Sequence, residues 1–138
     1  MVGQYTIIEY ALLILFVVLG ATLLLSSGDF ISLFLSIELQ SYGLYILCVV
    51  YRESESATSS GLTYFLLGGL SSCFILLGIV FIYVNTGVTS LDSFYVLTNL
   101  TTNIEFSNPI YKSQYITYSL LIISVGLLFK IGAAPFHF

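Results

Sequence analysis

Residues 126–138 read GLLFKIGAAPFHF, an apolar segment that carries one lysine, Lys130, and then reaches Pro135. Proline has no backbone N–H donor and crowds the preceding turn, so we predict that a helix breaks near Pro135. An ammonium group inside a bilayer costs about 2.5 to 3.5 kcal/mol on insertion scales, and such groups usually serve a function. This stretch therefore predicts a broken membrane helix with a functional charge.

The composition of the whole chain is that of a membrane protein. Of its 138 residues, 58% are hydrophobic and 7% are charged, whereas a soluble globular domain carries about 25% charged residues. At about 20 residues per span, the length accommodates four or five spans. We predict an all-α, polytopic membrane protein in which residues 1–138 form a single transmembrane domain. No basic cluster suited to nucleic acid is present in the sequence.

Four apolar runs are long enough to cross a bilayer, and we predict helices near residues 5–26, 30–50, 61–84 and 114–138. The link from Ser26 to Asp29 is so short that the first two helices must run antiparallel, side by side. Two reversals then make the second and fourth spans parallel. The polar loop 51–60 predicts a solvated turn, and residues 85–114 predict a surface segment rather than a separate domain.

Glu38 lies in the second run, FISLFLSIELQSYGLYILCVV. On a helix it would be about 12 Å from one end and about 18 Å from the other, close to the midplane of a hydrocarbon core about 30 Å thick. Ser41, Tyr42 and Tyr45 share its face and offer hydroxyls that can hydrogen-bond the acid or carry water past it. A functional site is the default interpretation, and the alternative is a protonated glutamic acid that joins two helices.

Other residues are interpreted from their neighbours along the chain. Gly126 and Leu127 share the face of Lys130, so a neighbouring helix or water can approach it. His137 is either an interfacial cap of the last turn or a proton relay. Glu9 lies in the first turn of the first span, where the helix dipole favours an acid. In the third run, small residues predict a face that another backbone can approach closely, namely Gly68 and Ser72 with Gly69 and Ser71.

Three stretches closely resemble one family: SIELQSYGLYIL (Ser36 to Leu47), GLTYFLLGGLSSCFILLG (Gly61 to Gly78) and FKIGAAPFHF (Phe129 to Phe138). The family is the antiporter-like membrane subunits of respiratory complex I, specifically subunit 2 of mitochondrial NADH:ubiquinone oxidoreductase, and the resemblance extends over nearly the whole chain. It implies a glutamate in one helix paired with a lysine in a later, broken helix, at Glu38 and Lys130. It also implies proton movement across the inner membrane, driven by electron transfer in other subunits.

The resemblance carries further expectations. It implies a multi-pass protein of the mitochondrial inner membrane, in contact with lipid and with other membrane-arm subunits of complex I. This chain would be a non-redox subunit of the reductase, with no catalytic, cofactor-binding or metal-binding residue of its own. NADH, FMN, iron–sulfur clusters and ubiquinone are then expected in other subunits. Family members continue past this motif through further helices, so we expect residues 1–138 to be a fragment of a larger antiporter-like fold. Cys48 and Cys73 lie in apolar runs and are interpreted as small core hydrophobes.

Two other classes of protein share features with this sequence. A four-span structural protein explains the number of spans but leaves two intramembrane charges without a role. A free-standing cation/proton antiporter would use the same Glu38 and Lys130. In either transport protein we predict a switchable pair, because a nearby carboxylate stabilises the ammonium and its loss favours proton release. Straight helices would leave the two groups at depths that differ by roughly 10 Å, so the lysine stem and a bridging water would have to close the gap.

Overall fold

The computed structural model describes residues 2–51, 53–103 and 110–132, and these residues form five α-helices. Four of the described helices are long and apolar enough to cross a membrane. The described residues contain no β-strand, only an isolated bridge between Asp29 and Ser90. The predicted all-α membrane fold is therefore confirmed. The chain divides into two compact units, Met1–Ser27 with Ser32–Gly69 and Gly28–Ile31 with Leu70–Phe138.

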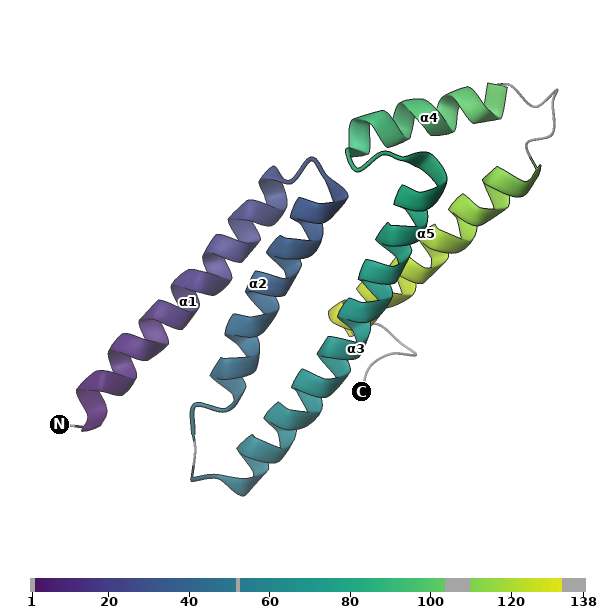
Figure 1. Ribbon diagram of the computed structural model, residues 1–138. Helices are drawn as coiled ribbons and strands as arrows, with labels where there is room; N and C mark the ends of the chain where they lie inside the picture. Colours follow the sequence, from purple (N-terminus) through teal and green to yellow (C-terminus); the bar gives the residue numbers. More distant parts are fainter. Residues whose placement is uncertain (1, 52, 104–109, 133–138) are drawn as a thin grey trace. The chain divides into compact units, whose positions relative to one another are not determined.

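The first unit is built on two antiparallel helices, α1 (Val2–Ser26) and α2 (Phe30–Cys48) (Figure 1). A Cβ atom added at Gly20 would lie 2.8 Å from the backbone nitrogen of Gln40, and one added at Gly43 would lie 2.7 Å from Cγ2 of Val17. Higher numbers on one helix thus meet lower numbers on the other. This register confirms the hairpin predicted from the short link.

The third helix, α3 (Glu55–Thr86), begins six residues before the predicted start at residue 61. The hydroxyl of Ser54 accepts a hydrogen bond from the backbone N–H of Ala57 at 3.0 Å, as expected for an N-cap. Inside the first turns, the hydroxyl of Thr58 donates to the carbonyl of Glu55 at 2.9 Å. Polar side chains that bond back to their own helix are compatible with it. The prediction of a solvated turn through residue 60 was wrong for this reason.

In the second unit, α5 (Ile110–Ile131) runs antiparallel to the later part of α3. A Cβ atom at Gly126 would lie 2.6 Å from Cγ1 of Ile75 and 3.0 Å from the carbonyl oxygen of Ser71. A Cβ atom at Gly78 would lie 2.9 Å from the carbonyl oxygen of Ser119. Each helix thus uses a glycine where the other helix's backbone comes close. We call these two contacts the glycine interlock.

A short helix, α4 (Leu91–Asn103), follows α3. At 13 residues it is roughly 20 Å long, too short to cross a bilayer. The backbone N–H of Phe30 donates to the carbonyl of Thr89 at 3.0 Å, and that of Leu91 donates to Gly28 at 2.9 Å. The rings of Phe30 and Phe94 meet edge to face at 5.5 Å. The link before α2 and the link before α4 are therefore joined, as expected when two spans separate them and return the chain to the same side.

The last described helix ends at Ile131, earlier than the predicted end at residue 138. Gly132 has a φ of 71°, a left-handed conformation that stops the helix, and its N–H donates to the carbonyl of Phe129 at 3.1 Å. The described helix thus ends four residues before Pro135, and the break predicted at Pro135 stays a prediction. Pro135 and His137 lie outside the described residues.

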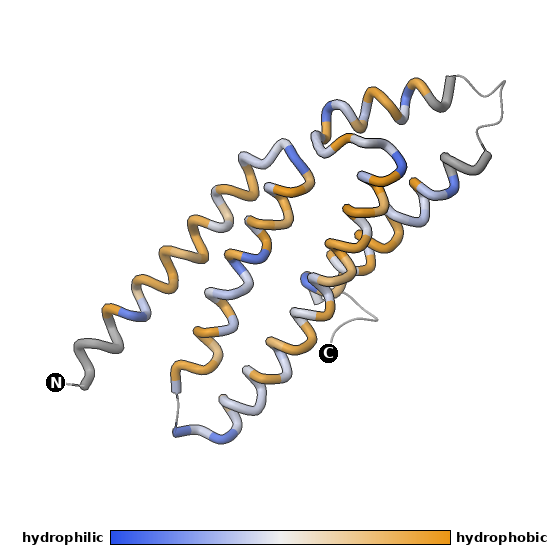
Figure 2. Tube along the Cα trace, viewed as in Figure 1, coloured by the Kyte–Doolittle hydropathy of each residue, from blue (hydrophilic) through white to orange (hydrophobic). Residues whose placement is uncertain are grey.

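Apolar side chains cover the outside of the helices as well as their contacts. Ile75 and Ile82 are fully buried, yet Leu15 and Leu66 are each 61% exposed. Figure 2 shows apolar colour along most of α1 and α3, and a hydrophilic stretch within α2. Such exposure suits a lipid surrounding, because lipid tails are as apolar as leucine. Cys48 and Cys73 are free and exposed, so their interpretation as core residues was wrong.

Candidate functional site

Glu38 lies eight residues after Phe30, the first residue of α2. The helix is continuous on both sides of it, which places it roughly 12 Å along the axis. Its side chain is half-buried. The depth predicted from the sequence is therefore retained, because α2 begins where the sequence indicated.

The hydroxyl residues that follow Glu38 on α2 lie in different surroundings. Ser41 is buried, and its hydroxyl donates to the carbonyl of Ile37 at 2.7 Å. Tyr45 is 6% exposed, whereas Tyr42 is 53% exposed. The stripe of hydroxyls thus has a packed part, Ser41 and Tyr45, and an open part, Tyr42.

Tyr45 is the centre of an aromatic cluster that joins α2 to the first part of α3. Its ring meets those of Tyr64 at 4.8 Å, Phe65 at 5.6 Å and Tyr42 at 6.0 Å, all edge to face. Gly68 leaves room for the phenol, because a Cβ atom there would overlap the hydroxyl of Tyr45. Sequence reasoning selected Gly68 as a packing residue, but its partner is a side chain and not a backbone. Tyr64 and Phe65 were missed, since nothing in their spacing names the helix that they meet.

Lys130 lies in the last turn of α5, and its side chain is half-buried. The free carbonyls at a helix C-terminus favour a cation there, typically by 0.3 to 1 kcal/mol. One turn earlier, Gly126 takes part in the glycine interlock with α3. Helix α3 therefore meets α5 one turn before Lys130, and what approaches Lys130 itself stays a prediction.

The two charges belong to different units, Glu38 to the first and Lys130 to the second. Their pairing remains a prediction, as does the parallel direction of α2 and α5. Of the other residues selected for proton transfer, Tyr42 is described and His137 is not.

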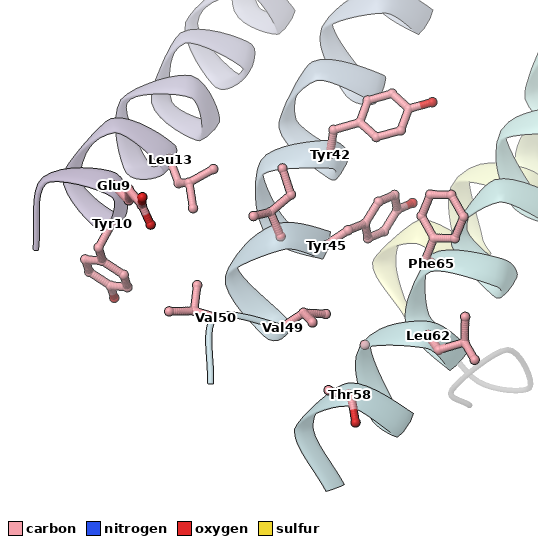
Figure 3. Close-up of a pocket in the computed structure, with 12 residues that line it drawn as sticks. Glu9, Tyr10, Leu13, Tyr42, Tyr45, Val49, Val50, Thr58, Leu62 and Phe65 are labelled. Carbon is pink, nitrogen blue, oxygen red and sulfur yellow. The ribbon is translucent and has the colours of Figure 1, made fainter. Parts of the chain in front are cut away.

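A cavity of about 830 Å³ lies within the first unit (Figure 3). Its wall is formed by the first half of α1, the end of α2 and the start of α3, and it includes Glu9, Leu13, Tyr42, Thr58 and Phe65. In Figure 3, Glu9 and Leu13 project from α1 toward α2, and Tyr45 projects from α2 toward Phe65. The cavity is lined mainly by carbon atoms, with one carboxylate among a few hydroxyls.

Metal-ligating side chains do not gather in the part of the chain that the structure describes. None of those residues forms a group of three or more His, Cys, Asp or Glu that could hold a metal ion. The chemistry that the described residues offer is that of an acid, a lysine and hydroxyls inside membrane helices.

Four helices long and apolar enough to cross a membrane, with Glu38 midway along α2 and Lys130 in the last turn of α5, define a class of polytopic membrane proteins that carry ionisable residues within their spans. Residues 27–138 match the family model described as NADH:quinone oxidoreductase/Mrp antiporter, transmembrane, and the chain belongs to this family. It is 53% identical over 135 residues to NADH-ubiquinone oxidoreductase chain 2 of Rhizopus oryzae, which covers 98% of this chain and 24% of that protein.

Solved structures of related complexes contain a similar fold. A chain of respiratory complex I from Thermus thermophilus, solved with bound aureothin, matches with a TM-score of 0.72 and 31% identity over 94% of this chain and 26% of that one. A chain of the archaeal membrane-bound sulfane sulfur reductase matches with a TM-score of 0.74 and 29% identity, covering 92% of this chain and 24% of that one. The chain thus spans about a quarter of the length of the relatives it matches.

Proposed function

We propose that this chain belongs to a proton-translocating membrane-arm subunit of respiratory complex I. The observation that carries the proposal is an acid midway along α2 and a lysine in the last turn of α5, in a chain 53% identical to an oxidoreductase chain 2. Membrane helices rarely keep ionisable residues without a use, because each is costly in hydrocarbon. The described depth of Glu38 and the half-burial of both side chains support this role.

In the proposed mechanism, Glu38 and Lys130 form the switchable pair. A separation that changes from about 4 to about 8 Å at an effective dielectric of about 20 alters their attraction by roughly 2 kcal/mol. That change is enough to move a proton between neighbouring groups. Tyr42, the open hydroxyl of the stripe, would pass protons or order water beside Glu38. His137 would act as a relay beyond Lys130.

The complex would supply what this chain lacks. Electron transfer from NADH through FMN and iron–sulfur clusters to ubiquinone is proposed to occur in other subunits, and this chain would be a non-redox member of the reductase. Its partners would be neighbouring membrane-arm subunits and lipid. We propose the mitochondrial inner membrane as its location, because the Rhizopus relative is a ubiquinone-type oxidoreductase chain.

A free-standing cation/proton antiporter is the second candidate, because the matching family model includes Mrp antiporters. Purification of the native protein under mild conditions separates the two functions. We expect it in a megadalton assembly with NADH dehydrogenase activity. Recovery in a small complex that exchanges cations for protons without NADH would refute the complex I assignment and support the antiporter.

A further inference from the structure

The cavity of the first unit has a polar mouth and an apolar interior. Glu9 lines the cavity together with Val49 and Val50, which directly follow the end of α2 at Cys48, and Thr58 lies in the first turn of α3. The polar part of the wall is therefore near the end of α2 and the start of α3. From Thr58 to Phe65 the wall extends roughly 10 Å along α3, which compares with about 15 Å for one leaflet of the hydrocarbon core. The cavity therefore runs from the headgroup region into one leaflet.

The described charges near the mouth are acidic. Glu9 lines the cavity, and Glu53 and Glu55 are exposed five and three residues before Thr58, which also lines it. The described residues of the cavity wall include no basic side chain. Arg52 belongs to the same link in the sequence and lies outside the described residues. A ligand with a net negative headgroup is disfavoured here, and one that presents a cation is favoured.

We propose that this cavity holds one acyl chain of a phospholipid with a primary ammonium headgroup, that is, a phosphatidylethanolamine. Its volume of about 830 Å³ lies within the range of small-molecule sites, about 300 to 1,000 Å³. The acyl chain would lie against Leu13 and Phe65, and the ammonium would donate hydrogen bonds to the carboxylate of Glu9.

The headgroup chemistry makes the proposal selective. A phosphatidylcholine of the same length carries a trimethylammonium, which has no N–H to donate to Glu9. A phosphatidylglycerol carries a net negative charge and no cation. The expected order of retention is ethanolamine, then choline, then glycerol. Neither Glu38 nor Lys130 lines the cavity, although it shares Tyr42 with the proposed proton path. The variants below leave Tyr42 unchanged and are read out by lipid retention, so their failure is distinguishable from a failure of the proton-transfer function.

The test uses the full-length protein in its native assembly, exchanged into nanodiscs with equal parts of the three phospholipids, each isotope-labelled. The assembly is then extracted into mild detergent, and the lipids retained on the subunit are counted by native mass spectrometry. We expect ethanolamine lipid to exceed choline lipid by roughly fivefold, the scale of one net hydrogen bond. Glu9→Gln should remove most of this preference while the acyl chain still binds.

A second pair of variants tests the acyl site. Leu13→Trp places a bulky ring in the cavity and should lower the number of retained lipids by about one, whereas Leu15→Trp is a matched control, because Leu15 lies on α1 outside the wall. Equal retention of all three lipids by the wild type would overturn the proposal. So would an unchanged preference in Glu9→Gln, or equal lipid counts for the two tryptophan variants.

Discussion

Substituting Gly126 with alanine tests whether α5 and α3 touch as the structure shows. The added Cβ would lie 2.6 Å from Cγ1 of Ile75 and 3.0 Å from the carbonyl oxygen of Ser71. The isoleucine side chain can rotate, but the carbonyl belongs to helix backbone and cannot move alone. One helix must therefore shift, and the interlock must loosen.

Two opposing effects set the change in the free energy of unfolding of Gly126→Ala. Overpacking a tight contact typically costs about 1 to 3 kcal/mol. Alanine is a better helix former than glycine by about 1 kcal/mol. Gly69 supplies a matched control, because it lies inside α3 and a Cβ there meets nothing within 4 Å. Gly69→Ala gains the same propensity without the clash, so Gly126→Ala should be less stable than Gly69→Ala by about 1 to 3 kcal/mol.

The assay is reversible unfolding of the purified protein in mixed micelles, with helicity followed by circular dichroism as the denaturing detergent increases. The quantity compared is the free energy of unfolding of each variant relative to wild type. If both variants are stabilised equally, Gly126 does not face the backbone of Ser71, and the interlock is refuted.

The remaining predictions concern the charges and the aromatic cluster. The Lys130→Ala variant should assemble normally yet lower proton pumping in proteoliposomes by roughly tenfold or more. The Lys130→Arg variant should restore pumping only partly, because a guanidinium does not release its proton. Full pumping by the alanine variant would remove Lys130 from the mechanism. Glu38→Gln should change both the rate of pumping and its pH dependence, and an unchanged profile would contradict the switchable pair. Tyr45→Ala should lower the free energy of unfolding by about 3 to 5 kcal/mol, since its ring is buried. Tyr42→Ala, at a half-exposed ring, should cost much less, and equal losses would contradict the cluster centred on Tyr45.

The spans could be predicted because each depends on one local property of the sequence, the length of an apolar run. Apolar runs of about 20 residues, separated by a four-residue link, leave few arrangements for α1 and α2. The start of α3 was not predictable from composition, since residues 55–60 are rich in serine and threonine, and their helix depends on the Ser54 cap. The helix α4 was expected only as a surface segment, and its Phe94 packs on Phe30, a residue distant in sequence.

In the candidate site too, some features could be predicted from the sequence and others depend on contacts between helices. The depth of Glu38 follows from its position along one helix, and so does its shared face with Tyr42. The partners of Tyr45 could not be predicted from its position, because periodicity identifies a face of a helix and not the helix that this face meets. Gly126 is an intermediate case: a glycine beside a charged residue indicated a close neighbour, and only the fold shows that this neighbour carries Ser71 and Ile75.

The length of α3 makes bilayer thickness a variable for this protein. Its 32 residues extend about 48 Å, against a hydrocarbon core of about 30 Å. A tilt within the usual range of 0 to 40° does not absorb this excess, so the polar turns at Glu55 to Ser60 must project into the headgroup region. The same rod carries Gly68 against Tyr45 and Gly78 against Ser119. A membrane of different thickness that changes the tilt of α3 would therefore strain the contacts of this helix in the aromatic cluster and in the glycine interlock.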